Sequence, residues 1–200
     1  MGKREDKARA TRAAILSAAA RMVGKVGYGR ASVSRIADEA GVSAGLIYRY
    51  FATQQDLFDH ILPELGEAML RHIAAAASGI EDPIERERVS FEANLSFLDE
   101  NPHMLRVMAE AAHMVPDAHR AYLERIARAY RRSLVHARAK GYLAEFDDSE
   151  LEALALMFIG AREYLLERYS LNGPELISLP QEMRDTYMKT VRRIMGSPQL

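Results

Sequence analysis

The sequence predicts an all-α protein of about nine helices, with a helix-turn-helix domain of three helices over residues 1–53 and a helical body over residues 54–200. Three observations support this fold class. Apolar residues recur at helical spacing along most of the chain, and no segment shows the alternation of a strand. Proline, glycine and capping residues divide the chain into helix-sized segments. A length of 200 residues, 48% of them hydrophobic, is enough to bury a sizeable core.

The first expected helix covers about residues 3–26 and packs its apolar face on the helices that follow. The basic residues at its start, Lys3, Arg4, Lys7 and Arg9, either contact phosphates or belong to a frayed, solvated terminus. The glycine-rich segment over residues 24–29 is not a phosphate-binding loop, because no strand precedes it and no lysine follows at the required spacing. It is predicted to be a helix stop and a turn.

Residues 32–51 read as two very short helices joined by a tight turn. Ser32 is placed to cap the first of these helices, which is amphipathic and ends at Gly41. A glycine directly after a helix takes the left-handed conformation that other residues resist. Ser43 can then cap the second helix, which directs Ile47 and Phe51 inward. This arrangement is a helix-turn-helix, a motif whose second helix reads DNA.

A long helix is expected next, capped by Thr53 and running toward Ala77. Pro63 lies well inside it, lacks an N–H group and crowds the carbonyl four residues earlier, so we expect a kink near residues 59–63. The kink is either a hinge or a fixed bend without a signalling role. Asp82-Pro83 and Asn101-Pro102 are helix-start signals, and they predict helices over about residues 83–99 and 102–112. A further helix is expected from Pro116 to Lys140, with Gly141 as its stop.

Two final helices are expected, from Asp148 or Ser149 to Tyr169 and from Gln181 to Met195, with a turn at residues 172–174 between them. The middle of the first, residues 154–161, is apolar on every side and must therefore be buried on every side. A second copy of the chain is the simplest cover, and Gly160 and Ala161 permit close approach. We expect a homodimer through these last two helices. The alternative is that the last helix covers only its own subunit.

The net charge of −1 hides a division along the chain. Up to Thr53 there are ten Lys and Arg against four Asp and Glu, whereas the remainder has seventeen against twenty-four. A basic module on an otherwise acidic protein suggests that one end faces DNA, although charge runs are often only solvated faces. The sequence has no cysteine, no run of about eighteen apolar residues and no secretory signal. We therefore expect a cytoplasmic protein without membrane contact.

Catalytic and metal-binding signatures are absent from the sequence, so we expect no enzymatic activity, no cofactor and no metal. There is no Gly-x-Ser-x-Gly elbow, no His-Glu-x-x-His and no Walker lysine loop. The six histidines are scattered, and none pairs with another at i, i+4 beside a carboxylate. The pair Asp147-Asp148 is interpreted as helix-start charge rather than as an acid and a base.

A ligand pocket is the better-supported kind of site in the helical body. Methionine and aromatic side chains on helices that must converge there can surround an irregular apolar ligand, although each singly is also an ordinary core residue. Arg162 interrupts the most apolar helix, so it either meets an anionic head group or pairs with a buried glutamate. The candidate ligand-binding residues are Phe97, Met104, Met108, Met114, Tyr122, Phe158 and Arg162, and Met157 shares their character.

From about Ala13 to Phe58 the sequence resembles the TetR (tetracycline repressor) family of bacterial transcription regulators. The residues that carry this resemblance are Gly27-Tyr28, Ile36-Ala37, Ala40-Gly41-Val42-Ser43, Gly45, Leu46-Ile47-Tyr48, Tyr50-Phe51 and Asp56-Leu57-Phe58. Beyond this stretch the similarity is one of length and helical character. One departure is Gln54, which stands where the family usually has a lysine, so a phosphate contact by charge is in doubt there.

The resemblance implies that the turn and the second helix of the motif contact DNA. The matching positions are Ser32, Ser34, Ser43, Ala44, Gly45, Leu46, Tyr48, Arg49 and Tyr50. Arg49 is the one side chain of the second helix that can form a bidentate pair with guanine, and the alternative for it is a phosphate contact. Tyr48 and Tyr50 can donate to phosphate or contact a thymine methyl group.

The sequence thus predicts a dimeric transcriptional regulator, most simply a repressor, that binds a pseudo-palindromic double-stranded DNA operator. A small hydrophobic or amphipathic effector would release it by favouring an arrangement in which the two recognition helices no longer match successive major grooves. One alternative is a DNA-binding regulator or activator without a small-molecule effector. Another is a helical enzyme or partner-binding module with an accidental helix-turn-helix resemblance.

Overall fold

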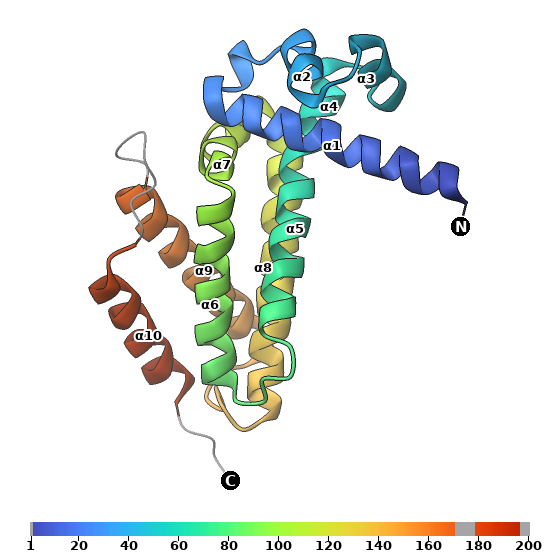
Figure 1. The fold of residues 1–200 in the computed structure, drawn as a ribbon. Helices are drawn as coiled ribbons and strands as arrows, with labels where there is room; N and C mark the ends of the chain where they lie inside the picture. The colour runs from blue at the N-terminus through green and yellow to red at the C-terminus, as the bar shows by residue number, and fades with distance from the viewer. Residues whose placement is uncertain (1, 171–178, 197–200) are drawn as a thin grey trace. The chain divides into compact units, whose positions relative to one another are not determined.

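The computed structural model describes residues 2–170 and 179–196, apart from the side chains of Lys3 and Ser170. Within these residues all regular structure is helical. The helices are α1 (Lys3–Val26), the 3-10 helix η1 (Tyr28–Arg30), α2 (Val33–Ala40), α3 (Ala44–Tyr50), α4 (Gln54–Asp59), α5 (Ile61–Ala76), α6 (Pro83–Glu100), α7 (His103–Met114), α8 (Pro116–Ala139), α9 (Asp148–Ser170) and α10 (Gln181–Met195) (Figure 1). The all-α prediction is confirmed, and the turn expected at residues 172–174 lies outside the described residues.

The caps predicted for the helix-turn-helix are present. Ser32 Oγ accepts a hydrogen bond from the Arg35 N–H at 3.4 Å, and Ser43 Oγ accepts one from the Leu46 N–H at 3.2 Å. Gly41 has φ 66° and ψ 33°, the left-handed conformation expected after α2. These caps satisfy amide groups that a helix cannot pair within its own first turn, so they fix the starts of α2 and α3.

The long helix expected from Thr53 to Ala77 is divided at His60 into α4 and α5. Thr53 caps α4 by accepting from the Asp56 N–H at 3.0 Å, as predicted. The break falls inside the interval of residues 59–63 in which the kink was expected. Its cause is Pro63, which sits in the first turn of α5, where a missing N–H is tolerated.

The chain divides into two compact units by its contacts. The first comprises residues 1–68 and 101–122, and the second residues 69–100 and 123–200. In the first unit α1 packs against α2, α4 and α7, and α7 also contacts η1. Its core contains fully buried Ile15, Ile36, Ile47, Phe51 and Leu57. The expected functional division at residue 53 is a different partition and stays a prediction.

In the second unit, the loops that end α5 and α8 are tied together. Lys140 Nζ donates to the carbonyl oxygen of Glu81 at 2.7 Å, and Tyr142 Oη donates to Asp82 Oδ2 at 2.9 Å. Leu143 N–H donates to the carbonyl oxygen of Met195 at 3.0 Å, which fastens the same loop to the end of α10. None of the described helices is long and apolar enough to cross a membrane.

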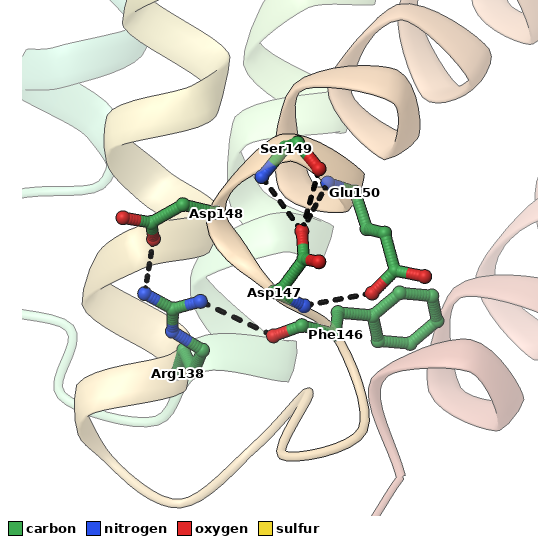
Figure 2. Close-up of polar contacts among 6 residues, drawn as sticks. All are labelled: Arg138, Phe146, Asp147, Asp148, Ser149 and Glu150. Carbon is green, nitrogen blue, oxygen red and sulfur yellow. Dashed lines mark hydrogen bonds and ion pairs between the residues drawn. The ribbon is translucent and has the colours of Figure 1, made fainter.

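The adjacent residues Asp147 and Asp148 both stabilise the start of α9 (Figure 2). Asp147 Oδ1 accepts from the N–H groups of Ser149 at 2.8 Å and Glu150 at 3.0 Å, and Glu150 Oε2 accepts from the Asp147 N–H at 2.8 Å. This reciprocal arrangement is a capping box. Asp148 forms an ion pair with Arg138 of α8, whose guanidinium also donates to the Phe146 carbonyl oxygen. The interpretation of Asp147-Asp148 as helix-start charge is confirmed.

Candidate nucleic-acid interface and buried polar cluster

The nine residues predicted to contact DNA all lie on α2, α3 or their caps, and none of them is buried. Ile47 points into the core, which leaves the rest of α3 accessible. Tyr48 is 52% exposed. The hydroxyl groups of Ser32 and Ser43 accept hydrogen bonds as caps, but each retains its own O–H donor. A donor at that place can reach a phosphate oxygen.

Arg49 is exposed and forms no hydrogen bond or ion pair with another described residue. Several other cations of the N-terminal segment are engaged. Arg21 and Lys25 both bind Glu39 of α2, at 3.0 and 3.2 Å, and these hydrogen bonds lower the pKa of the Glu39 carboxyl. Arg12 lies over the Phe51 ring at 5.2 Å. The guanidinium of Arg49 is therefore free for an external acceptor.

Gly45 lies in the first turn of α3, beside open space. A Cβ atom built there would meet only Ser43 Oγ, at 4.0 Å, so the fold of the protein itself leaves room for a side chain. Internal packing therefore does not require glycine at this position, and the surface of α3 is open there.

Gln54, which replaces the lysine usual in the family, has an internal partner. Its Nε2 donates to the carbonyl oxygen of Ala31 at 3.2 Å, just before the Ser32 cap. The side chain therefore links α4 to the start of α2. This hydrogen bond was not predicted, because the distance of 23 residues along the chain hides it from any local pattern.

The seven candidate ligand-binding residues are divided between the two units. Met104, Met108, Met114 and Tyr122 belong to the first unit, where Met104 and Tyr122 are buried and Met114 is exposed. The Tyr122 ring lies against α5 at Gly66, where a Cβ atom would come within 2.6 Å of it. Phe97, Phe158 and Arg162 belong to the second unit and are buried. Met157 is 68% exposed and does not line the interior.

In the second unit, Arg162 stands at the centre of a buried polar cluster. Its Nη2 forms an ion pair with Glu87 of α6, and its Nε donates to Tyr187 Oη of α10 at 2.8 Å. Tyr130 Oη of α8 donates to the same Glu87 carboxylate. The Arg162 guanidinium also lies 5.1–5.2 Å from the ring centroids of Phe91, Tyr130 and Tyr187. Arg162 thus forms the pair with a buried glutamate that the sequence left open as an alternative.

The protonation states of this cluster follow from burial and charge. Burial disfavours the Arg162 cation, but the Glu87 carboxylate and the hydroxyl groups of Tyr130 and Tyr187 together outweigh that effect, so the pKa of Arg162 lies above its ordinary value. Burial raises the pKa of Tyr187 to about 12 and that of Tyr130 well above its usual range. Both tyrosines are therefore neutral donors at physiological pH. The sequence signal that was missed is Glu87, which shares the inner face of α6 with Phe91 at i, i+4.

The outward face of α9 is apolar. Leu156, Met157 and Tyr164 are 54%, 68% and 68% exposed, and Gly160 between them would meet nothing within 4 Å if it carried a Cβ atom. A groove beside this face, with a volume of about 450 Å³, is lined by Leu123, Glu124, Ala127, Arg128 and Arg131 of α8 and by Glu152 and Leu156 of α9. The apolar stripe of α10 is used differently, because Tyr187, Val191 and Met195 are buried within their own chain.

Comparisons with known proteins identify similar molecules. A family model described as bacterial regulatory proteins of the tetR family matches residues 15–61. The nucleoid occlusion factor SlmA of Vibrio vulnificus is 30% identical over 101 residues, which cover 50% of this chain and 52% of that protein. The HTH-type transcriptional regulator BetI of Yersinia pestis is 36% identical over 84 residues, or 40% and 41% of the two chains. The match thus spans about half or less of these relatives.

Solved structures match over nearly the full length at low sequence identity. A TetR-family regulator from Rhodococcus sp. has a TM-score of 0.79 at 20% identity and covers 93% of this chain and 98% of its own. FadR from Bacillus subtilis, solved in complex with stearoyl-CoA, has a TM-score of 0.76 at 16% identity, covering 92% and 98%. At these identities the similarity establishes the fold.

Proposed function

Because the chain belongs to the TetR family of bacterial regulatory proteins, we propose that it is a sequence-specific DNA-binding regulator of transcription, and more narrowly a repressor. In this proposal residues 1–53 form the DNA-binding domain and residues 54–200 the effector-binding and dimerisation domain. The protein acts where the bacterial chromosome lies, in the cytoplasm. Its partners are a pseudo-palindromic operator, a second copy of the chain and a small effector.

The observation that carries the DNA-binding proposal is the accessible surface of α3. We propose that Arg49 pairs with a guanine edge or a phosphate, and that Tyr48 and Tyr50 contact phosphate or a thymine methyl group. The small residues Ala44 and Gly45 allow the helix to approach the groove, with Leu46 beside them. Ser32, Ser34 and Ser43 would donate to phosphates. The free guanidinium of Arg49 and the open space at Gly45 support this assignment.

We also propose a homodimer formed by α9 and α10 of two copies. The apolar outward face of α9 supports it, since a contiguous apolar patch of this kind marks an interaction surface. In this arrangement α10 contributes mainly the outward residues that its own subunit leaves uncovered. A two-fold dimer presents two recognition helices to two half-sites of a pseudo-palindrome.

The effector proposal is a hydrophobic or amphipathic small molecule bound by residues among Phe97, Met104, Met108, Met114, Tyr122, Phe158 and Arg162. Its support is their apolar and methionine-rich character, together with one buried cation. Since FadR from Bacillus subtilis was solved with stearoyl-CoA, a long-chain acyl-CoA is a suitable first probe. One observation favours the alternative of a regulator without effector: Glu87 already neutralises Arg162.

The first test is selection of bound sequences from random double-stranded DNA, followed by fluorescence anisotropy on the selected site. We expect selective binding whose log affinity falls linearly with log salt. Arg49→Ala should lower affinity for the selected site by about tenfold or more if Arg49 reads a base. If it contacts phosphate, all sequences should weaken equally and the salt slope should fall by about one.

Arg132→Ala is the matched control, because Arg132 is an exposed arginine of α8 that likewise forms no hydrogen bond or ion pair with another described residue. It removes the same charge far from α3 in sequence and should leave affinity nearly unchanged. Equal effects of the two substitutions would reduce the role of Arg49 to net charge. Failure of the wild-type protein to select any sequence would contradict the DNA-binding proposal itself.

A further inference from the structure

The glycine-rich turn between α1 and α2 holds a carboxylate of the same chain. α1 ends at Val26, and η1 follows from Tyr28 to Arg30. The Tyr28 N–H donates to Glu110 Oε2 of α7 at 2.9 Å. This turn lies within residues 24–29, the glycine-rich segment that is not a phosphate-binding loop. It nevertheless binds an anion, which α7 supplies from 82 residues farther along the chain.

The fit between the turn and the carboxylate is close. Gly27 has φ 80°, which favours glycine, and a Cβ atom there would lie 2.8 Å from each carboxylate oxygen of Glu110. Any side chain at position 27 would therefore displace the carboxylate as well as strain the backbone. The backbone conformation of the turn and the position of Glu110 depend on each other.

A second side chain of α7 completes the contact. Arg106 Nε donates to Glu110 Oε1 at 2.8 Å, and Arg106 Nη1 donates to the carbonyl oxygen of Lys25 at 3.1 Å. One turn earlier on α7, His103 packs closely on α1. A Cβ atom added at Gly24 would lie only 2.3 Å from the Cβ atom of His103. His103, Arg106 and Glu110 follow the spacing i, i+3, i+7 and so share one face of α7.

The turn connects this face of α7 to the helix-turn-helix. The Tyr28 ring packs edge-on against Phe58 of α4 at 5.2 Å between centroids. Ala31 and then the Ser32 cap of α2 follow directly. Burial opposes ionisation of Glu110, but the hydrogen bonds from Arg106 and from the Tyr28 N–H outweigh it and lower the pKa of this carboxyl. The charge at the turn is therefore present throughout the physiological pH range.

We propose that Glu110 is a positioning residue for DNA binding: its carboxylate fixes the α1–α2 turn and thereby the direction in which α2 and α3 leave α1. The inference rests on the proposed DNA-binding function. It assigns the readout of DNA partly to α7, a helix that the sequence places in the effector-binding half. Since α7 and residues 1–68 belong to one compact unit, this contact is a local one in space (Figure 1).

A purely structural role predicts something different. The Arg106 and Glu110 side chains are partly exposed, and ion pairs of this kind contribute little to global stability. If the pair were only such a surface bridge, its removal would leave DNA binding unchanged. If Glu110 positions the turn, its removal changes DNA affinity and local amide protection while most of the global stability remains.

The experiment compares four full-length proteins, and a fifth as a control, by anisotropy on the selected operator, by hydrogen exchange and by urea unfolding. They are wild type, Glu110→Ala, Glu110→Gln and the double variant Arg106→Glu with Glu110→Arg. We expect Glu110→Ala to bind the operator about tenfold more weakly, as for loss of a hydrogen bond to a charged group. Amides of residues 28–32 should exchange faster in it, with α6 unaffected.

The conservative and exchanged variants separate the acceptor from the ion pair. Glu110→Gln keeps an oxygen that can accept from the Tyr28 N–H, so it should retain intermediate affinity. The exchanged pair restores opposite charges at i, i+4 but leaves the Tyr28 N–H without an acceptor, and its affinity should stay low. Recovery of full affinity by the exchanged pair would overturn the proposal, because charge pairing alone would then suffice.

Glu85→Gln is the matched control, since Glu85 forms a similar ion pair with Arg88 on α6. It should change neither affinity nor exchange in residues 28–32. Unchanged operator affinity in Glu110→Ala, with wild type binding normally, would also overturn the inference while the proposed function stands. If wild type itself selects no DNA, the proposed function fails, and with it the basis of this inference.

Discussion

One buried guanidinium, that of Arg162, joins four helices of the second unit. Its partners come from α6, α8 and α10, while Arg162 itself belongs to α9. Desolvating two charges costs several kcal/mol per ion, so such a pair is a weak source of stability. Its geometric demands are strict, however, because the carboxylate and both hydroxyls must meet the planar guanidinium together. We interpret the cluster as fixing the register of these helices.

Removing one charged member of the cluster should therefore lower the free energy of unfolding strongly. Removing both charges together should lower it much less. We expect Glu87→Leu to lower the free energy of unfolding by about 3–5 kcal/mol, because Arg162 is left buried and unpaired. The double variant Glu87→Leu with Arg162→Met should recover most of this loss. Urea denaturation at one fixed protein concentration measures both changes.

Glu85→Gln serves again as the control for this prediction, because Glu85 is an exposed carboxylate two residues away on the same helix. It should change the free energy of unfolding by no more than about 0.5 kcal/mol. Equal losses in the single and double variants would show that packing volume, and not charge pairing, dominates at this site.

The glycines within helices differ in whether internal packing requires them. Gly24 and Gly66 face His103 and Tyr122 at distances that exclude a side chain, so internal packing requires them. Gly160 faces open space in the middle of α9, where internal packing requires no glycine. The sequence alone does not distinguish these two kinds of glycine. The structure separates glycines that serve the fold from those that leave room for another molecule.

At the scale of secondary structure, the junction between α4 and α5 is the clearest case of a local signal that determines geometry. Pro63 can donate no hydrogen bond to the Asp59 carbonyl oxygen, and the helix is interrupted at His60. The Thr53 cap fixes the start of α4, while Tyr28 packs on its Phe58. α4 is therefore fixed at its start by the Thr53 cap and near its end by the contact between Phe58 and Tyr28.

Pro63→Ala restores an N–H group that can bond to the Asp59 carbonyl oxygen. We expect α4 and α5 to merge into one helix, with increased protection of the amides of residues 60–64 in hydrogen exchange. If the junction is a hinge, operator affinity or effector response should change by several-fold. A merged helix with unchanged affinity and response would identify the junction as a fixed bend.

At the scale of the whole molecule, packing and chain order group the residues differently. α7 comes after α6 in the chain, yet it belongs with the N-terminal helices, and the segment 69–100 belongs with the C-terminal ones. On α9, the side chains of Leu156, Met157 and Tyr164 remain more than half exposed among the described residues. The first feature places α7 in the same compact unit as α3. The second supplies the surface through which we propose that two copies associate.

The dimer proposal predicts that a charge on the apolar face of α9 separates the subunits. We expect the wild-type protein to sediment as a dimer and Met157→Glu to sediment as a monomer at micromolar concentration, because an unpaired carboxylate cannot be buried in an apolar interface. Operator affinity should fall by at least tenfold, since a monomer contacts only one half-site.

Arg132→Glu introduces the same carboxylate side chain at an exposed position of α8 outside this face. It should leave the protein dimeric. Wild-type protein that sediments as a monomer at the same concentration would contradict the dimer, whereas a dimer that persists in Met157→Glu would place the interface elsewhere.

The sequence by itself determined the features that depend on neighbouring residues. The caps at Ser32, Ser43 and Thr53, the left-handed Gly41 and the interruption before Pro63 follow from groups only a few residues apart. Helix periodicity also separated inward from outward positions on α3. These interactions join residues that are close in sequence, so sequence patterns predict them without knowledge of the fold.

Only the tertiary structure decided which distant groups meet. The partner of Arg162 is 75 residues away in sequence, that of the Tyr28 N–H is 82 residues away, and that of the Gln54 amide is 23 residues away. The same structure divided the candidate ligand-binding residues between two units and buried the apolar stripe of α10 within its own chain. A buried charge or amide must find a partner, but composition and spacing do not reveal which one, because the choice depends on how whole helices pack.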